Sequence, residues 1–301
     1  MGWFSLLCVS TGADNLSQET ESDLMISGKA FVAGVMGWPV GHSRSPRLHH
    51  YWLERHGLDG AYVPLPVETQ YLEQALRALP VLGFRGVSLT LPHKEAALWL
   101  VDQVDPLARR VGAINTVVVR EGGTLEGYNT DVYGFAENLR SSGFALMDKP
   151  AIVLGAGGAA RSVVVALQDM GCPEIRIVNR SRQRAEQLAA GRGDGIKIFD
   201  WNESAQALQE AGLFVNATSL GMTGQPPLEI DMSPLSAEAW VTDVIYAPLE
   251  TDVLRHARLR GLRAVDGLGM LLYQAQPAFH AWFGVKPDVD AALRQFVLED
   301  L

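Results

Sequence analysis

Short runs of apolar and β-branched residues alternate along the chain with segments whose apolar residues recur every three or four positions. In the first half, the runs typical of strands fall at residues 30–37, 61–67, 84–91 and 114–119. The segments with helical spacing fall at residues 45–57, 71–80, 94–104 and 131–143. This alternation predicts βαβ units and a largely parallel sheet.

A second alternating series follows the turn-forming residues 148–150. Its strand-like or strand-and-helix segments fall at residues 151–171, 174–180, 212–219, 240–246 and 263–284. The last of these has a strand end, a glycine-rich turn and an amphipathic helix. The two series predict an α/β protein of two domains, 29–130 and 131–265, joined near the helix that begins at about Asp131.

Composition narrows the class of protein. The chain has 301 residues, which fits two domains of ordinary size, and a net charge of −9, which disfavours a general nucleic-acid binder. A local cationic cluster can still bind an anionic small molecule. Only Cys8 and Cys172 are present, so we expect no disulfide scaffold and a reducing, cytoplasmic setting. No apolar run is long enough to cross a bilayer. We expect residues 1–28 to form a mobile tail, with Met25 an alternative start.

A glycine-rich turn marks the start of the second series. The stretch LGAGGAA follows a strand-like run and opens a helix, with Gly155, Gly157 and Ala160 in the G-x-G-x-x-A pattern. Such glycines let the backbone approach a pyrophosphate at a helix N-terminus, although a strand-to-helix turn can also be glycine-rich for packing alone. The pattern favours a dinucleotide cofactor.

The end of the next strand indicates which dinucleotide. An NAD site usually places a carboxylate there, whereas this chain has Asn179 and Arg180, with Arg184 one helical turn later. Guanidinium groups can grip a 2′-phosphate, so NADP is favoured over NAD. The alternative is that Arg180, Arg182 and Arg184 form a solvated helix start.

Candidate chemistry also follows the strand at 84–91. The stretch LTLPHK ends this strand at a proline and presents Thr90, His93 and Lys94 together. Ligands of open α/β sheets bind at the carboxyl ends of strands, which favours a chemical role for Lys94. The alternative is an exposed lysine at a helix start. His93 is interpreted as a turn or cap residue.

Five separated stretches carry a resemblance to a known family. These are GHSRSP at 41–46, LTLPHK at 89–94, VGAINT at 111–116, GYNTD at 127–131 and DGLGMLLYQA at 266–275. With the glycine-rich turn, they resemble the shikimate dehydrogenases, NADP-dependent enzymes that interconvert 3-dehydroshikimate and shikimate in aromatic amino-acid biosynthesis. The resemblance runs from about residue 30 to the C-terminus.

The resemblance implies roles for particular residues. Lys94 and Asp131 would be catalytic, with Lys94 exchanging the proton and Asp131 holding its ammonium. Substrate would contact Ser43, Ser45, Thr90, Asn115, Tyr246 and Gln274, the two serines at its carboxylate. Cofactor would contact Gly155, Ala156, Gly157, Gly158, Ala159, Asn179, Arg180, Arg184, Val244 and Gly267. The family also implies a Rossmann-type second domain, C-terminal helices (266–301) packed back on the first domain, a monomer or homodimer, and no metal.

Some alternatives stay open. Asp131 and Ser45 both precede helical segments and could act as N-caps. Ser88 stands where the family often has asparagine, and Val132 where it often has glycine. A quinate/shikimate or aminoshikimate dehydrogenase of the same fold, or a catalytically silent NADP-binding regulator, is the rival hypothesis.

Overall fold

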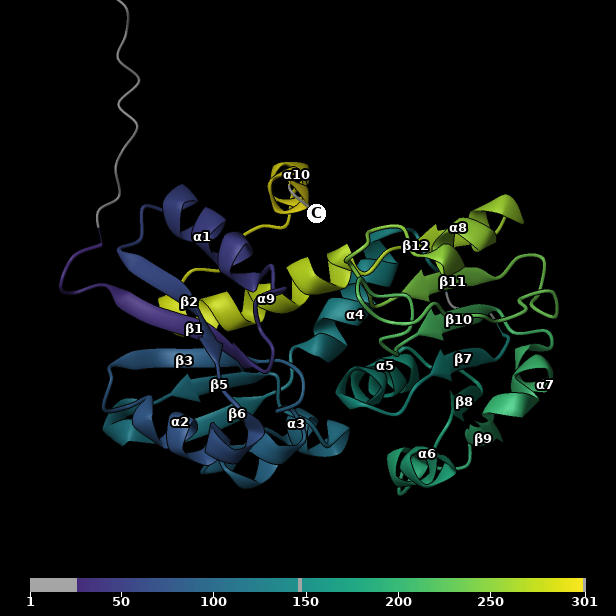
Figure 1. Cartoon of the computed structure of the whole chain (residues 1–301), viewed down its shortest axis with the longest axis horizontal. Coiled ribbons are helices and arrows are strands. Elements are labelled where there is room, and N and C mark those ends of the chain that lie inside the picture. The colour runs from purple at the N-terminus through teal and green to yellow at the C-terminus, as the bar shows by residue number, and fades with distance from the viewer. Residues whose placement is uncertain (1–25, 146–147, 300–301) are drawn as a thin grey trace, which may run out of the picture.

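A computed structural model describes residues 26–145 and 148–299 of the chain, so most of the predicted 1–28 tail lies outside the described residues (Figure 1). The strands are β1 (Phe31–Gly37), β2 (Gly60–Pro66), β3 (Phe84–Leu89), β4 (Gln103–Val104), β5 (Thr116–Val119), β6 (Leu125–Tyr128), β7 (Ala151–Leu154), β8 (Ile175–Asn179), β9 (Ile196–Asp200), β10 (Leu213–Asn216), β11 (Trp240–Asp243) and β12 (Arg263–Val265). The α-helices are α1 (Ser45–Arg55), α2 (Leu72–Ala78), α3 (Pro106–Val111), α4 (Asp131–Ser141), α5 (Gly158–Asp169), α6 (Arg182–Ala189), α7 (Ser204–Leu208), α8 (Asp252–Leu259), α9 (Leu268–Phe283) and α10 (Ala291–Leu298). Short 3-10 helices are η1 (Thr69–Tyr71), η2 (Ala96–Trp99), η3 (Glu121–Gly123) and η4 (Trp201–Glu203).

The described strands form two six-stranded sheets, which lie side by side in Figure 1 with α4 and part of α9 between them. The second sheet has the order β12-β11-β10-β7-β8-β9 and is parallel throughout. Its strand order reverses between β7 and β10, which is the switch point where doubly wound sheets bind ligands. The predicted α/β class with a Rossmann-type second unit is confirmed.

The first sheet is mixed, but the prediction of a largely parallel sheet is confirmed for five of its six described strands. Its order is β2-β1-β3-β5-β6-β4; β2, β1 and β3 form a parallel block, and β4 runs parallel to β6. Strand β5 runs antiparallel to both β3 and β6. Strands β5 and β6 are joined by a short connection, which suits an antiparallel pair, whereas a parallel pair needs a long crossover.

The predicted helix at residues 94–104 is also wrong. Only one 3-10 turn forms there, η2, followed by the two-residue strand β4. The turn at η2 has its own backbone hydrogen bonds, but the two ends of this segment bond to other segments of the chain. The Ile114 amide donates to the Lys94 carbonyl (2.8 Å), and the Asp102 amide donates to the Leu125 carbonyl (3.0 Å). Tertiary hydrogen bonds therefore override the helical spacing of the apolar residues.

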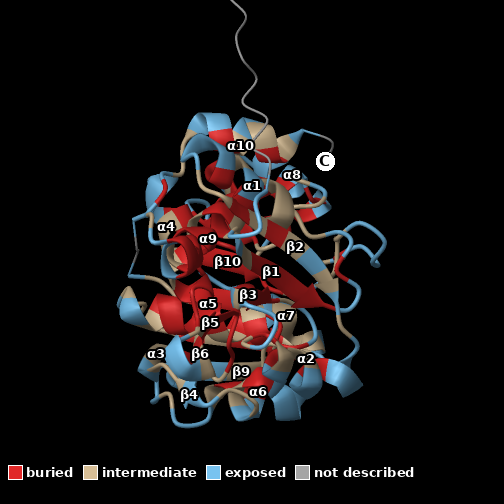
Figure 2. Cartoon of the chain, turned by 90° about the vertical axis from the view of Figure 1, so that its left-hand side faces the viewer, coloured by how far each residue is buried: buried red, intermediate tan, exposed pale blue. Residues whose placement is uncertain are grey.

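The C-terminal helices return to the first sheet, as expected. Helix α9 packs its apolar residues against β1 and α1, and the Trp282 indole N–H donates to the Val117 carbonyl on β5 (3.0 Å). Figure 2 shows buried residues gathered in α9, β1 and β3. This packing brings Gln274, in the middle of α9, to the carboxyl ends of the first sheet's parallel strands.

Close approach of α4 and α9 depends on Gly134. A Cβ at this position would lie 2.6 Å from the Gln274 Cβ and 2.7 Å from the Met270 carbonyl oxygen. Alanine gains about 1 kcal/mol over glycine in a helix interior, but overpacking of this kind typically costs about 1–3 kcal/mol. The backbone carbonyl cannot rotate away, so the steric cost exceeds the gain.

We therefore predict that Gly134→Ala lowers the free energy of unfolding, measured by urea denaturation, by about 1–2 kcal/mol. Gly195→Ala is the matched control, because a Cβ there meets only the Pro173 carbonyl oxygen at an ordinary 3.5 Å. Equal stability of the two variants would show that α4 and α9 can move apart at no cost.

Candidate active site

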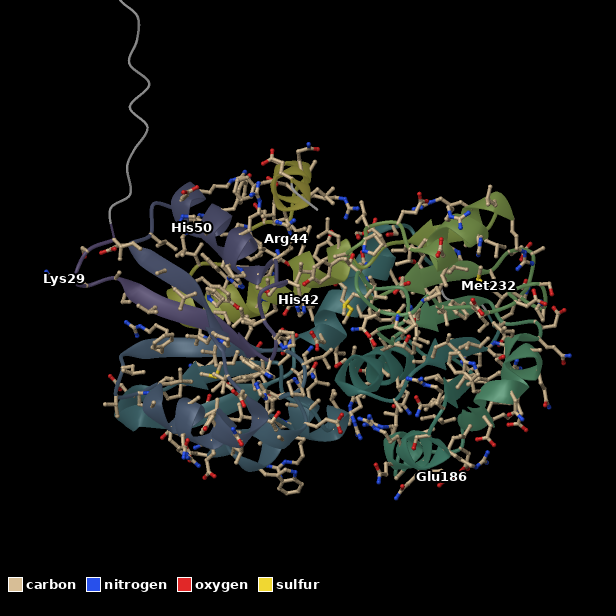
Figure 3. All side chains as sticks on the ribbon, viewed as in Figure 1. Lys29, His42, Arg44, His50, Glu186 and Met232 are labelled. Carbon is tan, nitrogen blue, oxygen red and sulfur yellow. The ribbon has the colours of Figure 1, made fainter. Side chains whose placement is uncertain are left out.

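One cavity between the two sheets collects all eight residues predicted to bind or convert substrate: Ser43, Ser45, Thr90, Lys94, Asn115, Asp131, Tyr246 and Gln274. The loop after β1 carries Ser43 and leads into Ser45, the first residue of α1, and Figure 3 shows the loop residues His42 and Arg44 at the end of the first sheet that faces the second. Ala159, Val244 and Gly267 of the predicted cofactor set line the same cavity. Residues predicted to contact substrate and residues predicted to contact cofactor therefore meet in one cavity.

The mixed topology of the first sheet explains this convergence. Thr90 and Lys94 follow β3, whose carboxyl end points to the cavity. Because β5 runs antiparallel to β3, its beginning lies at the same edge, and Asn115 immediately precedes β5. Because β6 runs antiparallel to β5, its end returns to this edge and leads into Asp131. The antiparallel β5–β6 hairpin thus places Asn115 and Asp131 beside the segment that carries Lys94.

Lys94 and Asp131 form an ion pair at the centre of the site. The Lys94 Nζ lies 2.6 Å from Asp131 Oδ2, and the exposed fractions of the two side chains are 17% and 6%. Thirty-seven positions separate the two residues in sequence. A charge pair that is so poorly exposed needs further polar partners, since water cannot supply them.

A buried amide network supplies those partners. The Asn115 side-chain amide donates to Asp131 Oδ1 (2.8 Å) and to the Thr130 hydroxyl (2.9 Å). Gln274 joins through its carbonyl oxygen, 3.3 Å from the same nitrogen. The side-chain oxygen of Asn115, Oδ1, in turn accepts from the Thr130 backbone amide (2.8 Å). Both oxygens of Asp131 are therefore held in place before substrate arrives.

Asp131 and Ser45 do not act as side-chain N-caps. Asp131 is the first residue of α4, and the amide of Val132 is satisfied by the Asn129 side chain (3.3 Å). Ser45 is the first residue of α1, and its own amide donates to the Ser43 hydroxyl (3.3 Å). Neighbouring side chains satisfy the helix ends, which leaves both of these groups to the cavity.

His93 has a structural place, as predicted. Its Nε2 lies 2.7 Å from the Val67 carbonyl oxygen, and its amide donates to the Thr90 carbonyl within the turn. Burial lowers the pKa of His93, while the hydrogen bond to Val67 opposes this shift. The ring therefore ties the turn that carries Lys94 to the chain after β2.

Tyr246 reaches the cavity from the end of β11. The preceding turn is held by Asp243, which accepts from the Ile245 amide (3.0 Å) and the Thr251 hydroxyl (2.8 Å). Burial raises the pKa of Asp243 to about 6, although these donors favour its charged form. Burial also raises the pKa of Tyr246, so its hydroxyl keeps a proton to donate.

The glycine-rich turn has the geometry that its sequence predicts. Gly155 adopts φ +106°, and a Cβ there would lie 2.9 Å from the Ala217 carbonyl oxygen, so glycine is required. Gly157 caps α5, and a Cβ there would meet no atom within 4 Å. At Gly158 a Cβ would lie 3.3 Å from the Lys94 side chain. An open helix N-terminus thus lies beside the lysine, which fits a dinucleotide pyrophosphate.

Asn179, Arg180 and Arg184 are not brought into this cavity. They lie at the end of β8 and the start of α6, and both arginines are exposed. The Arg184 guanidinium is 3.3 Å from Glu95, which also contacts Arg161 at 3.4 Å. Glu95 follows Lys94, so these ion pairs join the two halves of the molecule. No local pattern of residues predicts this contact, because it depends on how the two halves are placed.

The structure adds Ser88 to the cavity lining. Successive side chains of a strand point to opposite faces, so residues two apart share one face. Ser88 stands two positions before Thr90, and this spacing is the signal that sequence analysis missed. Among the described residues, no helix combines the length and apolarity needed to cross a membrane, and no group of three His, Cys, Asp or Glu side chains is arranged to hold a metal.

Comparison with known proteins follows the same division of the chain. Residues 35–117 match the shikimate dehydrogenase substrate binding domain, residues 138–222 match shikimate / quinate 5-dehydrogenase, and residues 267–295 match the shikimate 5′-dehydrogenase C-terminal domain. The shikimate dehydrogenase (NADP(+)) of Paramagnetospirillum magneticum is 58% identical over 91% of this chain and 100% of its own length. That of Rhodospirillum rubrum is 56% identical over 91% of this chain and 99% of its own.

Solved structures agree. Shikimate 5-dehydrogenase from Thermus thermophilus, in complex with NADP(H) and shikimate, superposes with a TM-score of 0.82 at 39% identity and covers 90% of this chain and 100% of its own. Quinate dehydrogenase from Corynebacterium glutamicum, in complex with NAD, superposes with a TM-score of 0.82 at 32% identity and covers 89% of this chain and 99% of its own. The chain belongs to the shikimate dehydrogenase family.

The network around Asp131 generates a prediction that needs no substrate. Asn115→Asp would replace a donor, 2.8 Å from Asp131 Oδ1, by a second carboxylate. Two carboxylates at that distance cannot both ionise freely, so one carboxyl group of the folded variant keeps its proton to higher pH than in the unfolded chain. Stability is then present at low pH and lost as the pH rises through the raised value.

We predict that Asn115→Asp is destabilised relative to the natural protein by about 1–3 kcal/mol more at pH 7 than at pH 4, measured by urea denaturation. The exposed Asn202→Asp makes the same charge change away from the site and should show no such dependence. A pH-independent difference for Asn115→Asp would mean that the two side chains are not in contact.

Proposed function

We propose that this protein is an NADP-dependent shikimate dehydrogenase, which reduces the ketone of 3-dehydroshikimate to the alcohol of shikimate and catalyses the reverse reaction. The observation that carries the proposal is the part-buried Lys94–Asp131 pair beside the open glycine-rich turn. Family membership supplies the reaction, and the pair supplies the acid and base that the reaction needs. Shikimate formation places the enzyme in the biosynthesis of chorismate and the aromatic amino acids.

Proton transfer is the part of the reaction assigned to this chain. NADPH, when bound, supplies a hydride to the ketone carbon. The ketone oxygen then needs a proton, and Lys94 donates it from its ammonium group. Asp131 holds that ammonium at 2.6 Å and so fixes the direction in which the remaining N–H bonds point. In the oxidative direction, neutral Lys94 takes the proton back from the alcohol.

The neutral polar side chains of the cavity recognise the substrate through hydrogen bonds. Asn115, Thr90 and Gln274 suit the ring hydroxyls of a polyol, and Tyr246 adds a further hydroxyl. Ser43 and Ser45 line the same cavity and bind the carboxylate. A substrate lacking one hydroxyl leaves a buried polar group without a partner, which is a strong basis for discrimination.

Substrate and cofactor binding are assigned to different halves of the chain. We assign substrate binding to residues 29–130 together with the returning segment 266–301, and cofactor binding to residues 131–265. Gly155 through Ala159 would hold the pyrophosphate, with Val244 and Gly267 near the nicotinamide. Asn179, Arg180 and Arg184 would hold the 2′-phosphate, for which Arg184 must share or leave Glu95. We further expect a cytoplasmic enzyme that is a monomer or a homodimer.

Purified protein should oxidise shikimate with NADP, measured by the change in nicotinamide absorbance. It should turn over quinate far less well than shikimate, and it should use NAD far less well than NADP.

Lys94→Ala and Asp131→Asn should lower kcat by about 10²–10⁴, because positioned acid–base groups contribute that much. The Kd for NADPH, measured by fluorescence titration, should stay within about threefold. Lys29→Ala, at the far end of the first sheet (Figure 3), is the control and should keep full activity. Near-natural kcat in both active-site variants would reject these roles.

Cofactor preference gives a separate prediction. Arg180→Ala should raise the KM for NADP about tenfold or more, while the KM for NAD changes little, because only NADP carries the charged 2′-phosphate. Arg182→Ala is the matched control, since that side chain is already paired with Asp200 and Glu186. Equal losses for the two cofactors would place the 2′-phosphate elsewhere.

A further inference from the structure

Ser88 and Tyr62 form a hydroxyl pair at the wall of the cavity. The Tyr62 hydroxyl donates to the Ser88 hydroxyl at 2.8 Å, a bond buried in the protein. The two residues come from β2 and β3, the strands on either side of β1. In the sheet register they stand opposite Ala33 and Val35, which lie on one face of β1, so the tyrosine reaches across that strand. Only Ser88 lines the cavity, and Tyr62 lies behind it.

The tyrosine ring is held firmly. His49, on α1, stacks on it with ring centroids 4.0 Å apart and an interplanar angle of 11°. Burial lowers the pKa of His49 to about 3, so the stacking ring is neutral. Neither nitrogen of His49 has a hydrogen-bond partner among the described residues. The histidine therefore acts by packing, and it fixes the plane of the phenol.

Counting protons shows what this arrangement leaves for a ligand. Burial raises the pKa of Tyr62, and hydrogen bonding to Ser88 and Ser45 opposes this rise only in part, so the phenol keeps its proton. That proton goes to the oxygen of Ser88. A serine hydroxyl can accept and donate at once. Among the described residues no hydrogen bond donated by Ser88 is found, so its own proton is available to the cavity that it lines.

We propose that Ser88 is a further substrate-binding residue, which donates a hydrogen bond to the substrate carboxylate, and that Tyr62 is the positioning residue that turns the Ser88 proton into the cavity. The assignment to the carboxylate rests on the proposed function and on the cavity wall, which Ser88 lines together with Ser43 and Ser45. Ser45 is the group assigned to that carboxylate. Lys94 and Asp131 serve the reacting oxygen instead.

A chain of hydroxyls strengthens the donor. Tyr62 donating to Ser88 polarises the Ser88 O–H bond, and hydrogen bonds in series reinforce one another in a medium of low dielectric. A hydrogen bond to a charged acceptor is stronger than a neutral one, so the carboxylate gains most. Removing the phenol hydroxyl should weaken binding of the acid without touching the proton-transfer groups.

The test crosses two variants with two substrates. Ser88→Ala and Tyr62→Phe are assayed with NADP and either shikimate or its methyl ester, which has the same ring hydroxyls but no carboxylate charge. For shikimate, Ser88→Ala should raise KM about tenfold or more and Tyr62→Phe several-fold, with kcat within about twofold. For the ester, both KM values should change less than threefold. Ser236→Ala, which removes a buried hydroxyl bonded to Lys149 in the second half, should change neither substrate's KM.

Equal losses for acid and ester would overturn the inference, since they would mean that the pair only supports the local fold. Unchanged KM values would overturn it as well. If Ser88→Ala does not fold, Tyr62→Phe decides alone, by the same comparison of acid and ester. Failure of the proposed function is a different result, because the natural protein would then turn over neither substrate.

Discussion

A lysine and an aspartate held 2.6 Å apart in a poorly solvated crevice are the interaction on which the rest of this molecule depends. Burying two charges is costly unless each finds further partners. The fold meets that cost with Asn115, Thr130 and Gln274, which come from the start of β5, the end of β6 and the middle of α9. The return of α9 and the close contact at Gly134 are needed to complete this network.

Much of the site could be predicted from the sequence, because its residues stand beside strand ends and helix starts that local patterns reveal. Strand periodicity located Thr90 and Lys94, and the glycine pattern located the turn at Gly155. The direction of β5 could not be predicted, since alternation of apolar residues is the same for parallel and antiparallel neighbours. The helix expected at 94–104 does not form. The Lys94 carbonyl accepts from the Ile114 amide, and the Asp102 amide donates to the Leu125 carbonyl, and these bonds exist only in the tertiary structure.

Residues contributed through space were the hardest to foresee. Ser88 enters the cavity by sharing a face of β3 with Thr90, and its meaning depends on Tyr62 two strands away. Glu95 joins Arg161 and Arg184 across the two halves, so the arginine assigned to a phosphate already has a carboxylate partner. The exposed Arg184–Glu95 pair is worth little in stability, but it engages an arginine that we assign to the 2′-phosphate of the cofactor.

The central claim is that Lys94 exchanges a proton with the oxygen that changes between ketone and alcohol, while Asp131 orients it. A crystal structure with NADP and shikimate bound tests this most directly. We predict the Lys94 Nζ within about 3.2 Å of the shikimate hydroxyl next to the nicotinamide, with Asp131 still bonded to the lysine. A water molecule or another side chain in that position, with Lys94 turned away, would contradict it.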